Sequence, residues 1–579
     1  MKDNKSDRTQ LSPSSSLSLL SLLSIHGFRS AALFIISVAS VFCLCVLRVH
    51  SQSVPEHISW TTLYEFLDEL AAEQVIMLNT ATKPYSRGLI AEKLLEAREK
   101  DRELSTRQRA EVEFYLRHFR LEAGNNARLD GDIDLLRRGE SSVSLFPAGI
   151  FHADSVFRAA LLPVLGLQVW SNDVETFRHR WNGIAGFGYI GEHVGVYGSL
   201  RDNNETVQLT RAQFLNQRAG APAKTAVSGG SDFSESRGGI TAGWEWGSVG
   251  LIKDHVAWGS GYNGPIILSG RVPSTAQIAL RLAPVWWFEF NYIHAWLVSN
   301  VLDSNATFYT PDGQRRDVLR DKYMAANFFT IRPWRHTAIS VGNSIVYSDI
   351  GIQAAYLVPF VFYKSVDHTL NGAANRTGQN AQMFLDISTR QLKHLHVYGT
   401  LFFDELNTRR FTEGDENNIF SMKAGARLSN WPLKDVMLTA EYTRSNPITY
   451  KHNLATTTYE SNNFVLGHYL RDNADEVHAS LIVRPLRGLR VAGSFTRARR
   501  GPDIPYITGT AAIKEQFMTE VRYEQRSIAF EAGYELAHNA RIFLGVDLST
   551  VTGPDAARYV PTPYLGERTT VTGGIFVGI

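Results

Sequence analysis

Residues 250–300 constrain the fold more than any other part of the chain, because they combine period-2 alternation, aromatic clustering and a glycine-rich turn. From Arg281 to Trp296 the odd and even positions carry different kinds of side chain, which predicts a strand with two unlike faces. Aromatic residues crowd one end of this strand, as in a girdle at a lipid–water interface: Trp286, Trp287, Phe288, Phe290 and Tyr292. The segment therefore predicts strands of a membrane β-barrel.

The composition fits a chain that would cross a membrane with strands. Its mean hydropathy is -0.15 and 20% of its residues are charged. After residue 50 the chain has no apolar run of about 18 residues, so we expect no helical span. The 45 Gly, 22 Tyr, 31 Phe and 11 Trp lie mostly in alternating segments, which suits an apolar outside and a polar inside. A net charge of +2 without a long basic run gives no indication of nucleic-acid binding.

Residues 1–53 are interpreted as a signal peptide and N-terminal extension. The two cysteines, Cys43 and Cys45, both lie in the apolar stretch Ala31–Leu47, which has a basic residue before it and a polar exit after it. This order is typical of a secretory signal that is removed on export, which would leave a cysteine-free mature chain. Lipidation is the weaker alternative, because large apolar residues precede both cysteines. A retained anchor would be at the short limit for a span.

Residues 54–124 predict a small periplasmic α-helical domain of three amphipathic helices. Ser86 can cap the second helix, and Ser105 with Gln108 can form a capping box on the third. The domain could dock to export proteins or brace the barrel mouth, and we expect the barrel to fold without it. The apolar positions at helical spacing are Leu63, Phe66, Leu67, Leu70, Leu94, Leu95, Ala97, Phe114, Tyr115, Leu116 and Phe119.

Residues 125–579 predict an antiparallel, all-β membrane barrel. Roughly 450 residues leave room for about 16 to 18 tilted strands, and the last strand, Thr569–Gly578, would close the barrel against the first. The other predicted strands are Phe157–Val169, Thr176–Tyr189, Val194–Arg201, Gly239–Trp246, Ser248–Trp258, Lys322–Ile331, Thr337–Tyr347, Gln382–Ser388, His396–Asp404, Phe420–Leu428, Val436–Arg444, Val477–Arg484, Leu489–Arg497, Phe517–Glu524, Ile528–Leu536 and Arg541–Asp547.

Long polar stretches between these strands are predicted to be extracellular loops. They contain many Asn, Gln, Asp, Tyr and Arg residues, which suit ligands rich in hydroxyl groups. The predicted loops are Asp202–Arg237, Leu302–Asp321, Asn407–Asn418, Asn446–Asn463 and Arg497–Thr510.

Two blocks of sequence carry a family resemblance. The first is Lys253-Asp254-His255, then Trp258-Gly259-Ser260-Gly261, then Leu268-Ser269 and Pro273. The second begins at Lys322 and reads KYMAANFFTIRPWRHTAISVGNSIVYSD, AYLVPFVFYKSVDHTL and VYGTLFFDEL in order. Together they resemble the Wzi-like capsule assembly family of outer-membrane proteins. The chain departs from that family's pattern at Asn327, where His is expected, and at Asn343, where Glu is expected.

The resemblance implies an eighteen-stranded barrel in the bacterial outer membrane, with a role in attaching or organising capsular polysaccharide. It extends over most of the chain, because LNTATKPYSRGLIAEKLLEA also resembles the family's helical region.

Motifs of catalysis and cofactor binding lack the context they need. Gly186–Gly191 matches a dinucleotide fingerprint, but it lies between two strands without a following helix. His394 and His396 bring no further ligands at readable spacing, so we predict no metal and no cofactor. Ser260 has no helix after it to supply an oxyanion hole. A barrel-embedded hydrolase stays a third alternative, and we expect no enzyme.

The candidate ligand-binding residues are of two kinds. Asp254, His255 and Trp258 belong to the block most like the family, and we expect them to fix local structure more than to touch ligand. Trp244, Trp246 and Trp258 are either platforms in the lumen or girdle residues, with the girdle favoured for each. Arginines in the loops suit the carboxylates of an acidic polysaccharide, or else pair with anionic lipid: Arg315, Arg316, Arg409 and Arg410, together with Arg320, Arg499 and Arg500.

The sequence thus predicts an outer-membrane barrel that binds and organises capsular or exopolysaccharide at the cell surface. The expected partners are surface polysaccharide, outer-membrane lipid and periplasmic polysaccharide export proteins. The alternative is an outer-membrane porin or oligosaccharide channel.

Overall fold

A computed structural model describes residues 53–124, 133–222, 224–225, 229–372, 378–411, 417–506, 514–537 and 540–578, and these belong to one compact unit. The expected signal peptide, with Cys43 and Cys45, lies almost wholly outside the described residues. Among the described residues no helix has the length and apolar character to cross a membrane.

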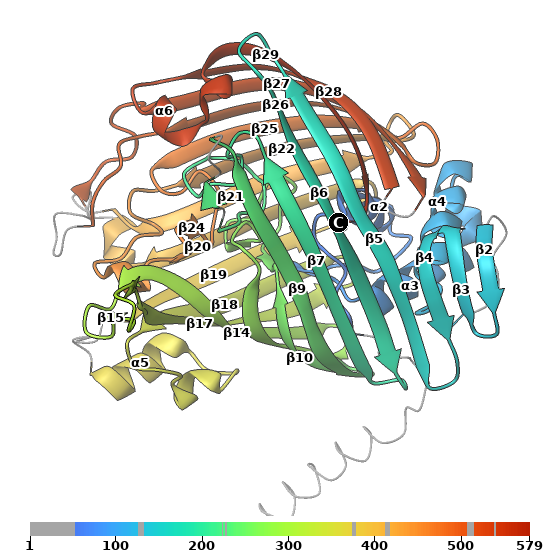
Figure 1. Ribbon diagram of the computed structural model, residues 1–579, viewed down its shortest axis with the longest axis horizontal. Coiled ribbons are helices and arrows are strands. Elements are labelled where there is room, and N and C mark those ends of the chain that lie inside the picture. Colours follow the sequence, from blue (N-terminus) through green and yellow to red (C-terminus); the bar gives the residue numbers. More distant parts are fainter. Residues whose placement is uncertain are drawn as a thin grey trace, which may run out of the picture. The chain divides into compact units, whose positions relative to one another are not determined.

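Eighteen antiparallel strands form a closed barrel, as expected, and Figure 1 shows their common tilt. They are β5 (Phe157–Ser171), β6 (Thr176–Ile190), β7 (Val194–Glu205), β9 (Ser231–Trp244), β10 (Gly247–Asp254), β13 (Thr275–Val285), β14 (Phe288–Leu302), β17 (Leu319–Trp334), β18 (Thr337–Ser348), β19 (Asn380–Thr389), β20 (Leu395–Glu405), β21 (Ile419–Ser429), β22 (Val436–Ser445), β25 (Ala474–Val483), β26 (Leu489–Arg500), β27 (Tyr523–Ala537), β28 (Ala540–Thr552) and β29 (Gly566–Val577).

The barrel closes where β29 pairs with β5, as the sequence predicted, with Val571 opposite Ser171 and Val577 opposite Leu165. The first part of β5 pairs instead with β4 (Ala148–Ala153). A three-stranded extension of β2 (Ile133–Arg138), β3 (Ser141–Phe146) and β4 therefore leaves the wall at this seam.

Short turns join the strands at one end of the barrel, and long connections join them at the other. Outer-membrane barrels place short turns in the periplasm and long loops outside the cell. The residue pairs 245–246, 286–287 and 335–336 form three of the short turns. Trp246, Trp286 and Trp287 are 39%, 51% and 49% exposed there, as a girdle requires.

Three predicted strands needed correction. Residues 281–296 do not form one strand, because the chain turns at Trp286-Trp287 between β13 and β14. Of the predicted strand Phe517–Glu524, just the last two residues lie in a strand, since β27 begins at Tyr523. The predicted strand Ser248–Trp258 leaves the wall after Asp254, where the chain turns inward.

Three helices follow the N-terminal segment: α2 (Thr61–Ala72), α3 (Arg87–Glu99) and α4 (Thr106–His118). Both expected caps are confirmed. The Ser86 hydroxyl accepts a hydrogen bond from the Leu89 N–H, and Ser105 with Gln108 forms a capping box. The apolar faces form one core whose centre includes Leu63, Phe66, Leu94 and Phe119, each 0% exposed.

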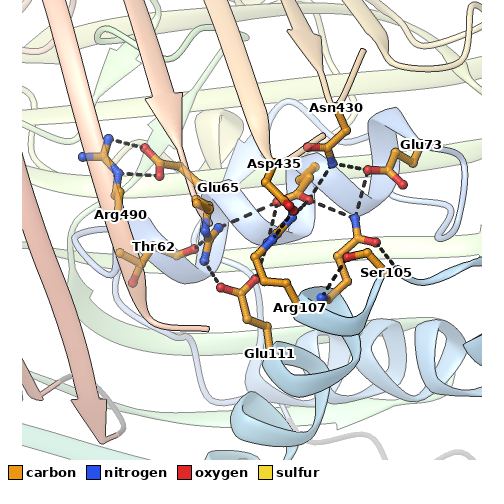
Figure 2. Close-up of polar contacts among 12 residues, drawn as sticks. Thr62, Glu65, Glu73, Ser105, Arg107, Glu111, Asn430, Asp435 and Arg490 are labelled. Carbon is orange, nitrogen blue, oxygen red and sulfur yellow. Dashed lines mark hydrogen bonds and ion pairs between the residues drawn. The ribbon is translucent and has the colours of Figure 1, made fainter. Parts of the chain in front are cut away.

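Charged side chains bind the helices to the short-turn end of the barrel (Figure 2). Glu65 of α2 accepts two hydrogen bonds of 2.9 Å from Arg490 of β26. Arg107 of α4 donates from Nε to Asp435 at 2.6 Å. Arg484, which follows β25, lies 2.9 Å from Glu111. These ion pairs show that the helices brace the barrel mouth, one of the two roles that the sequence left open.

Segments from both ends of the barrel meet inside it. Strand β1 (Thr82–Lys83) of the helical region pairs with β11 (Ala257–Trp258), which pairs with β12 (Leu268–Ser269). The connection between β10 and β13 therefore crosses the interior. It packs with the connection between β22 and β25 into an apolar cluster, which includes Trp258, Ile266, Ile267, Tyr459 and Val465.

Candidate functional site

Asp254 and His255 form part of a buried polar network against the inner wall. Asp254 accepts a hydrogen bond of 2.8 Å from the Tyr197 hydroxyl and one of 3.4 Å from Arg237. The His255 ring lies 2.8 Å from Glu235 and packs edge-on against His57. Burial lowers the pKa of His57 well below its ordinary value, which favours a neutral ring. Asp254 and His255 are 2% and 1% exposed, so these side chains are packed inside the protein and hold its own segments together.

Trp258 is part of the interior core. Its ring stacks on Phe328 of β17 at a centroid distance of 5.5 Å and meets Phe384 of β19 edge-on. It is 2% exposed inside the barrel, so the girdle position predicted for Trp258 was wrong, and the side chain holds the inward connection against the wall.

Trp244 and Trp246 lie at the β9–β10 turn, on the short-turn side of the barrel. The two rings meet edge-on at 5.3 Å. The turn lies at the opposite end from the long connections, and Trp246 is exposed beside the other girdle tryptophans. This position fits a girdle.

The loop arginines are separated from one another. Arg315 and Arg316 lie in the exposed strand β16 (Arg315–Arg316), and Arg315 pairs with Asp317 at 2.7 Å. Arg409 and Arg410 belong to a 3-10 helix (Thr408–Phe411), where Arg410 pairs with Glu405 at 2.8 Å.

The structure therefore distributes the sequence candidates over the interior, the short-turn end and separate loops, and it does not gather them into one site. Arg320, Arg499 and Arg500 also have carboxylate partners, at Asp349, Asp475 and Asp472.

A polar cavity at the long-loop end was missed by sequence reasoning. It is open to solvent, encloses about 530 Å³ when the adjoining solvent is included, and lies between the β7–β9 and β22–β25 connections. Amide and guanidinium side chains line much of it, together with one aromatic ring. The lining residues are Gln208, Arg211, Ala212, Gln213, Ala221, Pro222, Asn462, Asn463 and Phe464.

One wall of this cavity is a tight turn. Asn462 and Asn463 join β23 (Glu460–Ser461) to β24 (Phe464–Val465), and both have positive φ, 53° and 66°. A two-residue hairpin turn needs this conformation, which Asn tolerates. The Asn462 side chain accepts a hydrogen bond from Asn300 at 3.0 Å, while Asn463 is exposed. The Asn-Asn pair was the signal in the sequence that could have revealed this wall.

Arginine gives the cavity a positive charge. Arg211 lies in the lining, and its buried Nε has no hydrogen-bond partner among the described residues. Burial lowers the pKa of Arg211, because the charge loses water. The Arg271 guanidinium lies over the Phe464 ring, 5.5 Å from its centroid. Its pKa is lowered to about 9 by burial and by the charge of Arg471. An anionic group in the cavity would compensate the positive charge of Arg211.

Ser260, which was weighed for catalysis, and His396, which was weighed for metal binding, have structural partners. The Ser260 hydroxyl donates to Asp386 at 2.9 Å, and its backbone N–H donates to the same carboxylate at 2.7 Å. His396 lies 2.9 Å from the Ser388 hydroxyl and 2.7 Å from the Tyr262 hydroxyl. Ser260 and His396 are 8% and 4% exposed, and these contacts hold the inward connection to the wall.

Comparison with known proteins finds solved structures with a similar fold. No family model and no curated protein match the chain. Among solved structures it is similar to Wzi of Escherichia coli, described as an outer-membrane protein involved in group 1 capsule assembly and as a carbohydrate-binding β-barrel. The TM-score is 0.53 at 12% identity, over 91% of this chain and 99% of that one. The chain has the fold of Wzi.

The fold that the sequence resemblance implied is thus confirmed, and the chain is an outer-membrane β-barrel. OprD and OccD3 of Pseudomonas aeruginosa also match, at 9% and 10% identity and TM-scores of 0.38 and 0.41. Each match covers 72% of this chain and at least 90% of the other. These scores are too low to bear on function.

Proposed function

We propose that this barrel binds surface polysaccharide at its long-loop end. The observation that carries the proposal is the polar cavity lined by Arg211, Asn462, Asn463 and Phe464. Amide groups pair with sugar hydroxyls, and an aromatic face covers sugar C–H groups. The Arg211 guanidinium, which lies in the lining, suits the carboxylate of an acidic sugar. Binding at this site would retain or organise capsular or exopolysaccharide at the cell surface.

The filled interior supports adhesion over diffusion. The inward connection places Trp258, Ile266 and Ile267 in an apolar cluster with barrel-wall residues. A diffusion porin keeps a polar, water-filled interior, whereas close-packed apolar side chains exclude water. The likeness to Wzi, which is described as binding carbohydrate, favours the same reading.

Two further proposals concern the export of the protein and the location of its helical region. Residues 1–53 would direct export, and the helical region 54–124 would lie in the periplasm. The exposed side chains of α3 and α4 would then be available to polysaccharide export proteins, for example at Glu92, Glu99 and Glu113.

Binding of purified protein to acidic and neutral polysaccharides on a glycan array tests the main proposal. Arg211→Gln should weaken binding of a uronic-acid polysaccharide roughly 10-fold or more, since a charged hydrogen bond contributes about 1.5–3 kcal/mol. Arg315→Gln is the matched control, because Arg315 already pairs with Asp317. Equal losses in both variants, or no binding by the parent protein, would overturn the assignment of this cavity.

A further inference from the structure

The outer wall of the barrel is covered by protein over β14, β17 and β18. Outward positions on this wall are identified by Ile331 and Val341, which are 46% and 51% exposed. Other side chains that point outward from this wall are buried. Phe290 and Tyr292 of β14 point to the same outer face and are 0% and 4% exposed. The sequence had placed both in an exposed girdle, and this was wrong.

The cover is the connection between β18 and β19, with a 3-10 helix (Ala354–Leu357) and α5 (Tyr363–Asn371). Figure 1 shows α5 outside the ring of strands, next to β18. Phe360 stacks on Phe290 at a centroid distance of 4.3 Å. Tyr356 and Tyr363 are both 0% exposed in the same outer cluster. The connection therefore folds down the outside of the wall.

Two asparagines fasten this connection to the wall. Asn327 donates to the carbonyls of Pro359 at 2.9 Å and Val361 at 2.8 Å. Asn343 donates to the Asn327 side-chain oxygen at 2.7 Å and accepts from the Tyr363 N–H at 2.8 Å. Asn327 and Asn343 are the two positions where the chain departs from the family pattern.

Hydrogen bonding explains why polar residues occupy outward positions on this wall. Irregular backbone is tolerated at membrane depth where its polar groups are satisfied by protein. An amide side chain supplies both donors and an acceptor, whereas an ionised glutamate would accept only. Asn327 and Asn343 can therefore satisfy two carbonyls and one N–H of the connection.

The far side of the connection is apolar. Exposed fractions there are 38% for Leu357, 48% for Val358, 55% for Phe360 and 46% for Phe362. The exposed side chains of α5 are mostly polar and include Lys364 and His368. This change from apolar to polar along the segment matches the change from acyl chains to headgroups in a leaflet.

We propose that residues 357–362 contact the acyl chains of membrane lipid, as an embedded extension of the outer wall. The patch continues the lipid-facing surface that Ile331 and Val341 mark on β17 and β18. Lipid is thus the occupant that the surrounding wall already requires. This inference is independent of polysaccharide binding.

Site-directed spin labelling in phospholipid vesicles tests it. With Cys43 and Cys45 replaced by serine, no other cysteine remains in the chain. Single cysteines at Phe360→Cys and Val358→Cys carry the nitroxide, and the second keeps the test open if the first does not fold. Val341→Cys reports the lipid-facing wall, and Ser304→Cys reports an exposed loop.

Labels at 358 and 360 should collide with oxygen more than with a water-soluble nickel chelate, as the label at 341 does. A label that behaves like the one at 304 would overturn the proposal by showing contact with water. Dipolar broadening that disappears on dilution with unlabelled protein would also overturn it, by showing that a second copy covers the patch.

Discussion

Arg484 at the mouth of the barrel and Glu111 on α4 lie 2.9 Å apart, and both side chains are almost completely buried. This ion pair joins two residues that are 373 positions apart in the sequence. The guanidinium also lies 3.9 Å from Glu69 of α2. A buried charge left without its partner is strongly unfavourable. The helices and the barrel wall therefore depend on each other for stability.

Removing one member of this pair should destabilise the protein. We expect Glu111→Leu to lower stability by roughly 3–5 kcal/mol, because Arg484 stays buried with less compensation. The double variant Glu111→Leu/Arg484→Leu should recover part of the loss. Thermal unfolding of the detergent-solubilised protein measures both. Additive losses in the double variant would show that the two side chains are not coupled.

Deleting residues 58–122 should prevent the barrel from reaching its heat-modifiable form. This reverses the sequence-based expectation that the barrel folds without the helices. The deletion would remove Glu65 and Glu111 from Arg490 and Arg484, and it would remove the carbonyl of Asn79 from Arg332. Gel mobility with and without boiling is the measurement, and a mobility shift retained by the deletion variant would contradict the prediction.

Stability should fall in acid because of Glu65. Burial would raise the pKa of this carboxyl, but the Arg490 guanidinium outweighs burial and lowers it from 4.5 to about 2. The folded protein therefore favours the ionised form, so the stabilisation is complete above about pH 4.5 and is lost as the pH falls toward about 2. The shift corresponds to about 3 kcal/mol at most. Glu65→Gln should make the melting temperature less dependent on pH in this window.

The fold was predictable where one periodicity operated alone. Strands β6 and β18, for example, alternate in the sequence. Each begins at its predicted first residue and ends one residue beyond its predicted last residue. The turn at Trp286-Trp287 was missed because aromatic residues continue across it. Residues 255–274 were hard to predict for a different reason. An inward connection packs on several strands at once, and no local pattern encodes those distant contacts.

The candidate site was predicted from loop composition and from the block that resembles the family. Loop arginines were expected to bind ligand, but Arg315 and Arg410 pair with nearby carboxylates. Arg211 was not singled out, although it is the arginine that lines the cavity. Its role depends on the meeting of two connections about 250 residues apart, near Arg211 and Asn462. No local pattern in the sequence indicates that these two connections meet.

The Asn327 side chain should be needed for the outer connection. Asn327→Leu keeps a similar volume but leaves the carbonyls of Pro359 and Val361 without this donor. Each unsatisfied buried group costs roughly 1–3 kcal/mol. We expect a lower melting temperature, whereas Asn305→Leu in an exposed loop should have little effect. Equal melting temperatures for the two variants would show that the connection does not depend on Asn327.

Conductance should be low in planar bilayers, because the inward connection and the helical region meet inside the barrel. Replacing residues 259–267 by a short Gly-Ser linker should raise it, since Ile266 and Ile267 would leave the interior cluster. High conductance of the unmodified protein would favour the channel alternative over adhesion.

Trp258 should act through structure and not through ligand contact. The ring is 2% exposed and stacks on Phe328, so Trp258→Ala should cost roughly 3–5 kcal/mol by leaving a cavity in the interior core. Trp258→Phe keeps part of the stacking surface and should lose less. Thermal unfolding and polysaccharide binding are measured on the same preparations. Binding per folded molecule should be retained in Trp258→Phe, because the cavity beside Arg211 does not include this ring. A Trp258→Ala variant with unchanged melting temperature and abolished binding would instead place the tryptophan in the ligand site.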